Sequence, residues 1–154
     1  MLPRIATGLI AVATGTAAIE ASTYLDMLIR GRPPSQVPAD TAGAIAQSVG
    51  ISLDGGTEKG SNRRSGLGAL LGYGAGLGLG VAYAVLEPMA PDLPLPVSGA
   101  GLGLAAMATT DVPATATGST DPRRWGPSGW LSDLVPHLIY GLVVVAVYHG
   151  LRSD

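Results

Sequence analysis

The sequence has no cysteine and no phenylalanine, and it has few charged residues. The absence of cysteine excludes disulfide bonds, thiolate catalysis and metal sites built on cysteine. Charged residues make up 13% of the 154 residues, against roughly 25% in soluble domains. So few charges cannot easily cover the surface of a soluble domain of this length. The net charge of −2 disfavours nucleic acid as a partner, because nucleic-acid binders present a basic face.

Hydrophobic residues, by contrast, make up 47% of the chain and gather in four segments that are almost free of charge. A bilayer core of about 30 Å requires about 20 helical residues. The segment 65–86 meets this requirement cleanly, and the other three do so with some polar residues. We therefore predict a single all-α, polytopic membrane domain whose partner is the lipid bilayer. Its four transmembrane helices are expected at about 5–29, 65–86, 94–112 and 134–151.

Glycine stands at every second position from Gly72 to Gly80. A phosphate-binding loop is not expected, because no Gly-Lys-Ser/Thr triplet is present and the loose dinucleotide-type pattern at 101–106 follows no strand. At helical spacing the glycines form a ridge of the glycine-zipper kind, which lets membrane helices approach closely. Gly74 and Gly78 lie on the opposite side, so we expect neighbours on two sides. The predicted packing positions are Gly68, Gly72, Gly76, Gly80, Gly99 and Gly103.

Lysine and arginine predict the orientation in the membrane. Basic residues lie between the first and second and between the third and fourth predicted helices, whereas the connection EPMAPD carries only acids. We expect both termini and this short connection to face outward, the two longer loops to lie in the cytoplasm, and Trp125 and Trp130 to act as interfacial anchors. The first 18 residues also resemble a secretory signal. Because the apolar pattern continues past Glu20, we expect this segment to be retained.

The first cytoplasmic loop is predicted to contain a short amphipathic helix over residues 40–50 that lies at the membrane interface. Asp40 is its expected N-cap, and Gly50 is expected to end it. Residues 54–64 are rich in glycine and polar side chains, and they are predicted to form a flexible linker to the second membrane helix.

Short matches in the same order predict that the chain contains two copies of a two-helix hairpin. Such copies would be parallel repeats related by an axis along the membrane normal. The matching features are PSQVPAD and PSGWLSD, the equal spacings from Gly8 to Glu20 and from Gly99 to Asp111, and the dipeptides Tyr73-Gly74 and Tyr140-Gly141.

The four-helix plan, the acid in the first helix of each half and the HLIYG motif that opens the fourth helix resemble the YagU-like type of small bacterial inner-membrane protein. The second helix departs from this pattern, with Leu70 where the second copy has His137. The resemblance implies a location in the inner membrane and brings no biochemistry with it.

Two acids in the predicted membrane helices are candidates for function, because an intramembrane carboxylate is costly and often functional. Glu20 shares its helix face with Thr16. It is either a functional group of the protein or a structural acid that joins neighbouring helices through hydrogen bonds. Asp111 is its counterpart in the second copy. Pro113 is expected to break the helix beside Asp111 and to free carbonyl groups there, although a break of this kind can also simply end a helix.

His137, Tyr73 and Tyr140 complete the candidate polar site. His137 can exchange a proton near neutral pH, and its alternative role is a hydrogen bond between helices. Asp133 is expected to be the N-cap of the fourth membrane helix, with Pro136 in its first turn. We expect no metal site and no cofactor, and no catalytic motif supports an enzyme.

Two functions of different classes follow. In the first, the chain is a structural or accessory membrane component that packs its glycine faces against a second copy or a larger complex. In the second, the acids, His137 and the two tyrosines line a small polar cavity for protons or a small solute. The abundance of glycine favours the first function, and convergence of the polar side chains would favour the second.

Overall fold

The structure is a computed structural model that describes residues 2–54, 56–89 and 93–152. These residues form five α-helices and two short 3-10 turns, and no strand occurs among them. The elements are α1 (Leu2–Arg30), α2 (Val37–Ser48), α3 (Thr57–Leu86), η1 (Glu87–Met89), α4 (Leu95–Ala116), η2 (Pro122–Arg124) and α5 (Pro127–Gly150).

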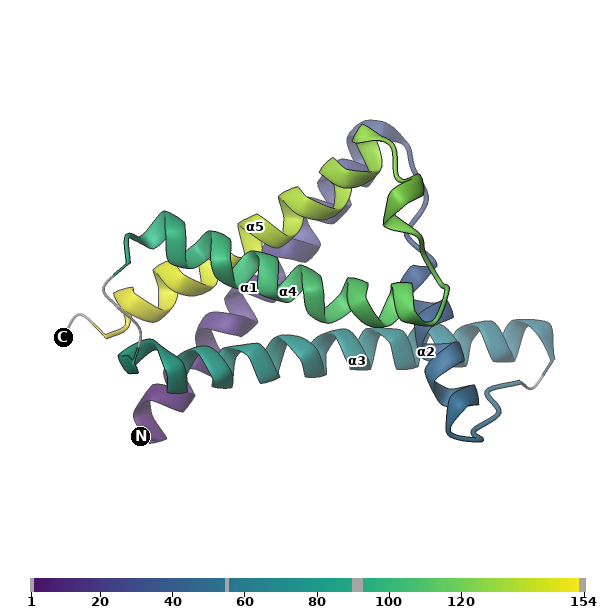
Figure 1. The fold of residues 1–154 in the computed structure, drawn as a ribbon, viewed down its shortest axis with the longest axis horizontal. Helices are drawn as coiled ribbons and strands as arrows, with labels where there is room; N and C mark the ends of the chain where they lie inside the picture. Colours follow the sequence, from purple (N-terminus) through teal and green to yellow (C-terminus); the bar gives the residue numbers. More distant parts are fainter. Residues whose placement is uncertain (1, 55, 90–92, 153–154) are drawn as a thin grey trace.

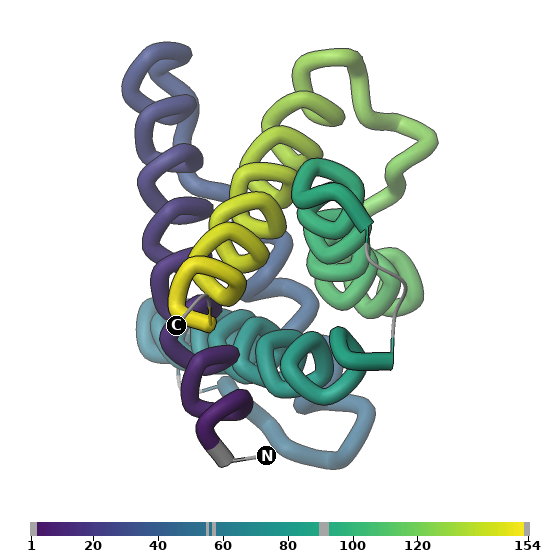
Figure 2. The backbone as a smooth tube through the Cα atoms, turned by 90° about the vertical axis from the view of Figure 1, so that its left-hand side faces the viewer, coloured from purple at the N-terminus to yellow at the C-terminus, as the bar shows by residue number. Residues whose placement is uncertain are grey.

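Four long helices make up the body of the protein, and the short α2 packs against the first half of α3 (Figure 1). Helix α5 contacts both α1 and α4, and it runs antiparallel to both. Helix α3 crosses α1 at a steep angle, since Figure 2 shows α3 nearly end-on where α1 stands upright. The start of α1 and the end of α5 lie on the same side of the molecule (Figure 1).

Three of the four predicted spans are helices long and apolar enough to cross a membrane. They lie within Pro3–Arg30, Glu58–Met89 and Pro127–Gly150, and they indicate a multi-pass membrane protein. Helix α4, the third predicted span, is not in this group within the described ranges. The reason is visible in its last two turns, where Thr109, Thr110 and Asp111 interrupt the apolar sequence.

Two long helices begin earlier than the sequence predicts. Helix α3 starts at Thr57 rather than at residue 65, so the prediction of a flexible linker over 54–64 is wrong. Helix α5 starts at Pro127 with Gly126 as its N-cap, so Asp133 is not a cap and lies inside the helix. In both cases the extra turns are polar, and hydropathy cannot detect them although their residues tolerate the helical conformation.

The short helix α2 spans Val37–Ser48 instead of 40–50. Asp40 lies in its first turn and does not cap it, because Pro38 already suits the first helical turn. Gly50 adopts a φ of 78° just beyond the end of α2, which confirms it as the stop. Ala42 and Ala46 are buried, and their face packs against α3.

Pro113 does not break its helix, so that prediction is wrong. Helix α4 continues through Pro113 to Ala116. The carbonyl of Pro113 accepts hydrogen bonds from the amide and the hydroxyl of Thr117, at 2.9 and 2.8 Å. One missing amide in the last two turns of a helix is tolerated when the following turn still closes.

Glycines bring α4 and α5 into backbone contact. A Cβ atom on Gly103 would lie 2.5 Å from the carbonyl oxygen of His137, and one on Gly99 would lie 2.8 Å from the Leu142 side chain. A Cβ atom on Gly141 would collide with the backbone of Gly99 and Gly103. Gly99 and Gly103, two of the predicted packing positions, therefore lie against α5 in the structure.

The predicted glycine ridge of α3 is used on one side and not along its whole length. A Cβ atom on Gly80 would collide with Val12 of α1, and one on Gly68 would lie 2.7 Å from the carbonyl oxygen of Pro38 in α2. Gly76 faces Val12, Thr16 and Tyr140 at ordinary contact distances. Apart from the backbone of α3 itself, no atom of the described residues lies within 4 Å of a Cβ placed on Gly72, Gly74 or Gly78. Gly74 and Gly78, which were expected to face a second neighbour, therefore face none within the described part of this chain.

Replacement of Gly103 by alanine should destabilise the protein by about 1–3 kcal/mol, because the new methyl group would press on a helix backbone that cannot move aside cheaply. Gly74→Ala is the matched control, and it should be neutral or stabilising by up to about 1 kcal/mol, since its surroundings are open. Thermal unfolding of both variants in mild detergent measures the difference. Equal melting temperatures would contradict the close α4–α5 contact.

Candidate functional site

The contact between α4 and α5 brings two acids and a histidine together. The helices are antiparallel and touch at Gly103 and His137. Asp111 lies about two turns beyond Gly103 on α4, and Asp133 lies one turn before His137 on α5. The side chains of Asp111 and Asp133 are close enough to interact with each other, and they can form a hydrogen bond when one of them is protonated. We name Asp111, Asp133 and His137 the carboxyl–histidine site.

A hydrogen bond between two carboxyl groups requires that one of them carries a proton. Oδ2 of Asp133 is buried, and no N–H or ordinary O–H donor of the described residues reaches it. A proton between Asp111 and Asp133 would supply the missing donor. No lysine or arginine side chain in the described part of the chain forms an ion pair with either acid. The pair therefore has to limit its negative charge by keeping a proton, as closely spaced carboxylates do.

His137 is held in one orientation beside this pair. Its Nδ1 lies 2.8 Å from the backbone carbonyl oxygen of Asp133 and 3.6 Å from Oδ1 of the same residue. Because a carbonyl oxygen only accepts hydrogen bonds, Nδ1 carries the hydrogen. In the neutral ring, Nε2 is then the nitrogen that can accept a proton. The site thus combines a shared proton with a neighbouring base.

The other predicted site residues lie elsewhere and do not form one cavity with this site. The hydroxyl of Tyr73 donates a hydrogen bond of 2.9 Å to Oε1 of Glu20, which joins α3 to α1. Tyr140 is 3% exposed, and its hydroxyl donates to the carbonyl oxygen of Gly76 at 3.4 Å. The five predicted residues therefore fall into a carboxyl–histidine site, a Glu20–Tyr73 pair and an isolated interhelical tyrosine.

Asp133 is the site residue that the sequence-based interpretation missed. Its distance of four residues from His137 places both on one helix face, and this spacing was available in the sequence. The error came from the assumption that the helix starts at residue 134, which turned Asp133 into a cap.

The predicted duplication stays a prediction. Under it, Asp111 would correspond to Glu20 and Tyr140 to Tyr73. Glu20 pairs with Tyr73, but Asp111 pairs with Asp133. The side-chain partners of the two halves therefore differ.

An ion-pair network next to the carboxyl–histidine site fastens the end of α1 to the start of α5. Asp26 pairs with Arg30 at 3.3 Å and with Arg32 at 2.5 Å. The Ser132 hydroxyl donates to Asp26 at 3.2 Å, and Arg30 donates to Ser132. The residue before Asp133 is thus fixed to another helix.

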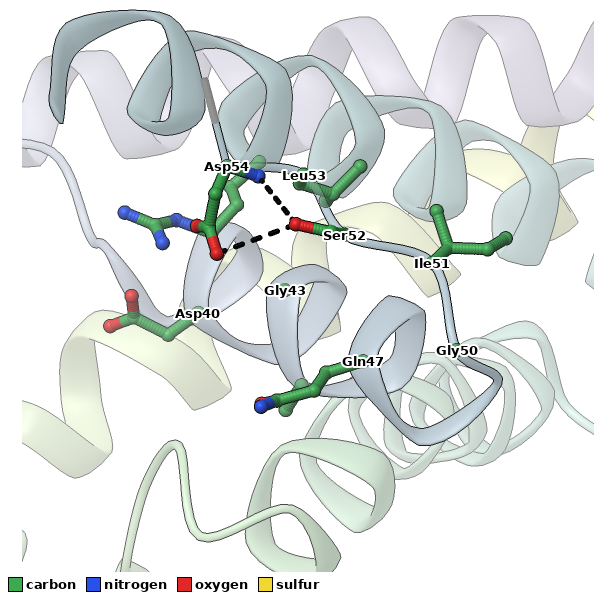
Figure 3. A pocket seen from close by; sticks show the side chains of 10 residues that line it. Asp40, Gly43, Gln47, Gly50, Ile51, Ser52, Leu53 and Asp54 are labelled. Carbon is green, nitrogen blue, oxygen red and sulfur yellow. Dashed lines mark hydrogen bonds between the residues drawn. The ribbon is translucent and has the colours of Figure 1, made fainter. Parts of the chain in front are cut away.

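A pocket of about 450 Å³ lies between α2, the following loop and α3 (Figure 3). The hydroxyl of Ser52 accepts a hydrogen bond from the amide of Asp54 and lies 3.4 Å from its carboxylate. Figure 3 shows that the side chains of Asp40, Gln47 and Asp54 end at separate places in this pocket. Their polar groups therefore do not converge on one ligand position.

No cluster of three or more histidine, aspartate or glutamate side chains suited to a metal ion occurs in residues 2–54, 56–89 and 93–152. Comparison with protein-family models, curated proteins and solved structures finds no significant match to this chain.

The shared proton can be tested by infrared spectroscopy of the protein in bilayers at neutral pH. We expect the carbonyl absorption of a protonated carboxyl group in the native protein. It should disappear in both Asp111→Asn and Asp133→Asn, because an asparagine amide donates the hydrogen bond without a proton from solution. Asp121→Asn is the control, since Asp121 accepts from the Arg123 amide at 3.1 Å outside the site. A band that survives both substitutions would show that the acids do not share a proton.

Proposed function

We propose that this chain is a multi-pass membrane protein that takes up and releases a proton at the carboxyl–histidine site. The observation that carries the proposal is the proximity of Asp111 and Asp133 where two helices meet, with no lysine or arginine among the described residues in an ion pair with either acid. Ionisable groups inside a membrane protein typically mark proton or ion pathways. A carboxyl pair with one proton and an adjacent imidazole base can pass that proton on.

The proposal includes α4 as a fourth membrane span. Helix α4 runs antiparallel to α5 and packs along it, and α5 is long and apolar enough to span. A helix that follows a spanning helix at backbone contact shares its depth. The polar end of α4 is then covered by α5 through the pairing of Asp111 with Asp133.

The proposed orientation places the carboxyl–histidine site in the cytoplasmic half of the membrane. The end of α1, the start of α3, the end of α4 and the start of α5 point to the same side (Figure 1). Most of the basic residues lie at these ends, as expected of the cytoplasmic side. The resemblance to YagU-like proteins belongs to this proposal and adds only the inner membrane as the location.

Cysteine labelling tests the orientation. Cysteines at Ser61 and Ser119 should react with a membrane-impermeant reagent only after the inner membrane is opened. A cysteine at Met89, which is 80% exposed on the opposite side, should react in intact cells. Asp92, in the same predicted outer connection, lies outside the described residues. Labelling of Ser61→Cys in intact cells would reverse the proposed topology.

The proton function can be measured in liposomes that contain the purified protein and a pH-sensitive dye. A potassium gradient with valinomycin supplies the driving voltage. The native protein should carry protons faster than empty liposomes, and Asp111→Asn or Asp133→Asn should slow this flux by at least about tenfold, because neither variant can hold the shared proton. Asp121→Asn should behave like the native protein.

A native flux equal to that of empty liposomes would contradict proton transport. The second candidate function, a structural or accessory membrane component, would then account for the chain better. It is favoured by the open side of α3, where a Cβ on Gly74 or Gly78 would meet no other part of the described chain within 4 Å and Leu70 is 68% exposed. In that case the Asp111→Asn and Asp133→Asn variants should change only the melting temperature.

A further inference from the structure

A second polar position, separate from the carboxyl–histidine site, lies in a pocket on the side of the α1–α3 pair. The pocket has a volume of about 250 Å³, enough for about eight water molecules at their liquid volume. Apolar groups make up most of its lining, and Glu20 and Tyr73 supply the charge and the phenol. Its lining residues are Val12, Ala13, Thr16, Ala17, Glu20, Tyr73 and Leu77.

The pocket opens sideways, away from the core of the protein. Val12, which is 1% exposed, belongs to the buried core. Tyr73 and Leu77 on α3 are 49% and 45% exposed, and Ala13 and Ala17 on α1 are exposed as well. Both helices are long and apolar enough to cross a membrane, so this opening faces the bilayer. A ligand can therefore enter from the lipid without crossing the protein.

Glu20 has a neutral partner and no cationic one. The Tyr73 hydroxyl donates to Oε1, which orients the carboxylate but leaves its charge uncompensated. No lysine, arginine or histidine in the described residues forms an ion pair with Glu20, and the arginines at the end of α1, Arg30 and Arg32, are bound to Asp26. A carboxylate in apolar surroundings is costly unless it meets an opposite charge.

An aromatic ring lies beside this carboxylate. Tyr73 lines the pocket together with Glu20, and its hydroxyl is bonded to Glu20. Aromatic faces attract organic cations, and the attraction grows when the cation is removed from water. A carboxylate, a phenol and small apolar side chains together fit a positively charged amine on an apolar body.

We propose that the Glu20–Tyr73 pocket binds a monovalent organic cation that enters from the membrane. Its ammonium group lies against the Glu20 carboxylate and the Tyr73 ring, and its apolar body lies over Ala13, Ala17 and Leu77. The binding does not depend on the carboxyl–histidine site, which lies between other helices. This chain thus has two separate polar functions, of which the second selects an amphipathic cation.

Equilibrium dialysis of radiolabelled benzyltrimethylammonium against protein in zwitterionic-lipid nanodiscs tests the proposal. We expect saturable binding above that of empty nanodiscs. Glu20→Gln should weaken it by at least about tenfold, equivalent to about 1.4 kcal/mol. Glu58→Gln is the matched control, because Glu58 lies in the first turn of α3, outside the pocket. Neopentylbenzene, the uncharged isostere, should compete poorly.

A second variant separates loss of the pocket from loss of the charge. Leu77→Trp should fill the pocket and abolish binding while Glu20 is retained, whereas Leu71→Trp, on the same helix but outside the pocket, should bind normally. Circular dichroism confirms that each variant is helical. Unchanged binding in both Glu20→Gln and Leu77→Trp, or equal competition by neopentylbenzene, would overturn the proposal and leave only partition into lipid.

Discussion

The backbone contact between α4 and α5 at Gly99, Gly103 and Gly141 is the constraint on which the rest of the structure depends. The hydrophobic effect does not drive helices together in lipid, so close packing and polar contacts must supply the attraction. Glycine allows that packing because no side chain separates the two backbones. The same contact fixes the register of the two helices, and farther along the pair Asp111 interacts with Asp133.

The polar side chains are distributed by helix pair. The α4–α5 pair holds two adjacent acids, for which we propose a shared proton, whereas the α1–α3 pair holds one acid with a phenol and an open side pocket. The number of carboxyl groups in each helix pair explains why the two polar sites differ. Two adjacent carboxyl groups can neutralise each other's cost through one proton, but a single carboxylate has to find its counter-charge outside the chain. The shared proton leads to the proposed proton uptake and release, and the need for an external counter-charge leads to the proposed binding of an organic cation.

The helices were predictable from the sequence because long apolar runs and four-residue glycine spacing are local patterns. The starts of α3 and α5 were not predictable in this way, since their first turns are polar and a hydropathy pattern gives no signal for polar helical turns. That error also hid Asp133. The choice between used and open glycine positions, such as Gly80 and Gly74, depends on where distant helices cross, and no local pattern contains that information.

The ion-pair network at the end of α1 has a mechanical consequence. Asp26 and Arg30 hold Ser132, which is the residue directly before Asp133. A displacement of the α1 end relative to α5 would therefore pull on the backbone next to the carboxyl pair and change the separation of the two acids. Motion of the loop that follows α1 would thus be transmitted to the carboxyl–histidine site through Ser132 and the α5 backbone, with a second contact from Arg30 to the carbonyl oxygen of Ser128.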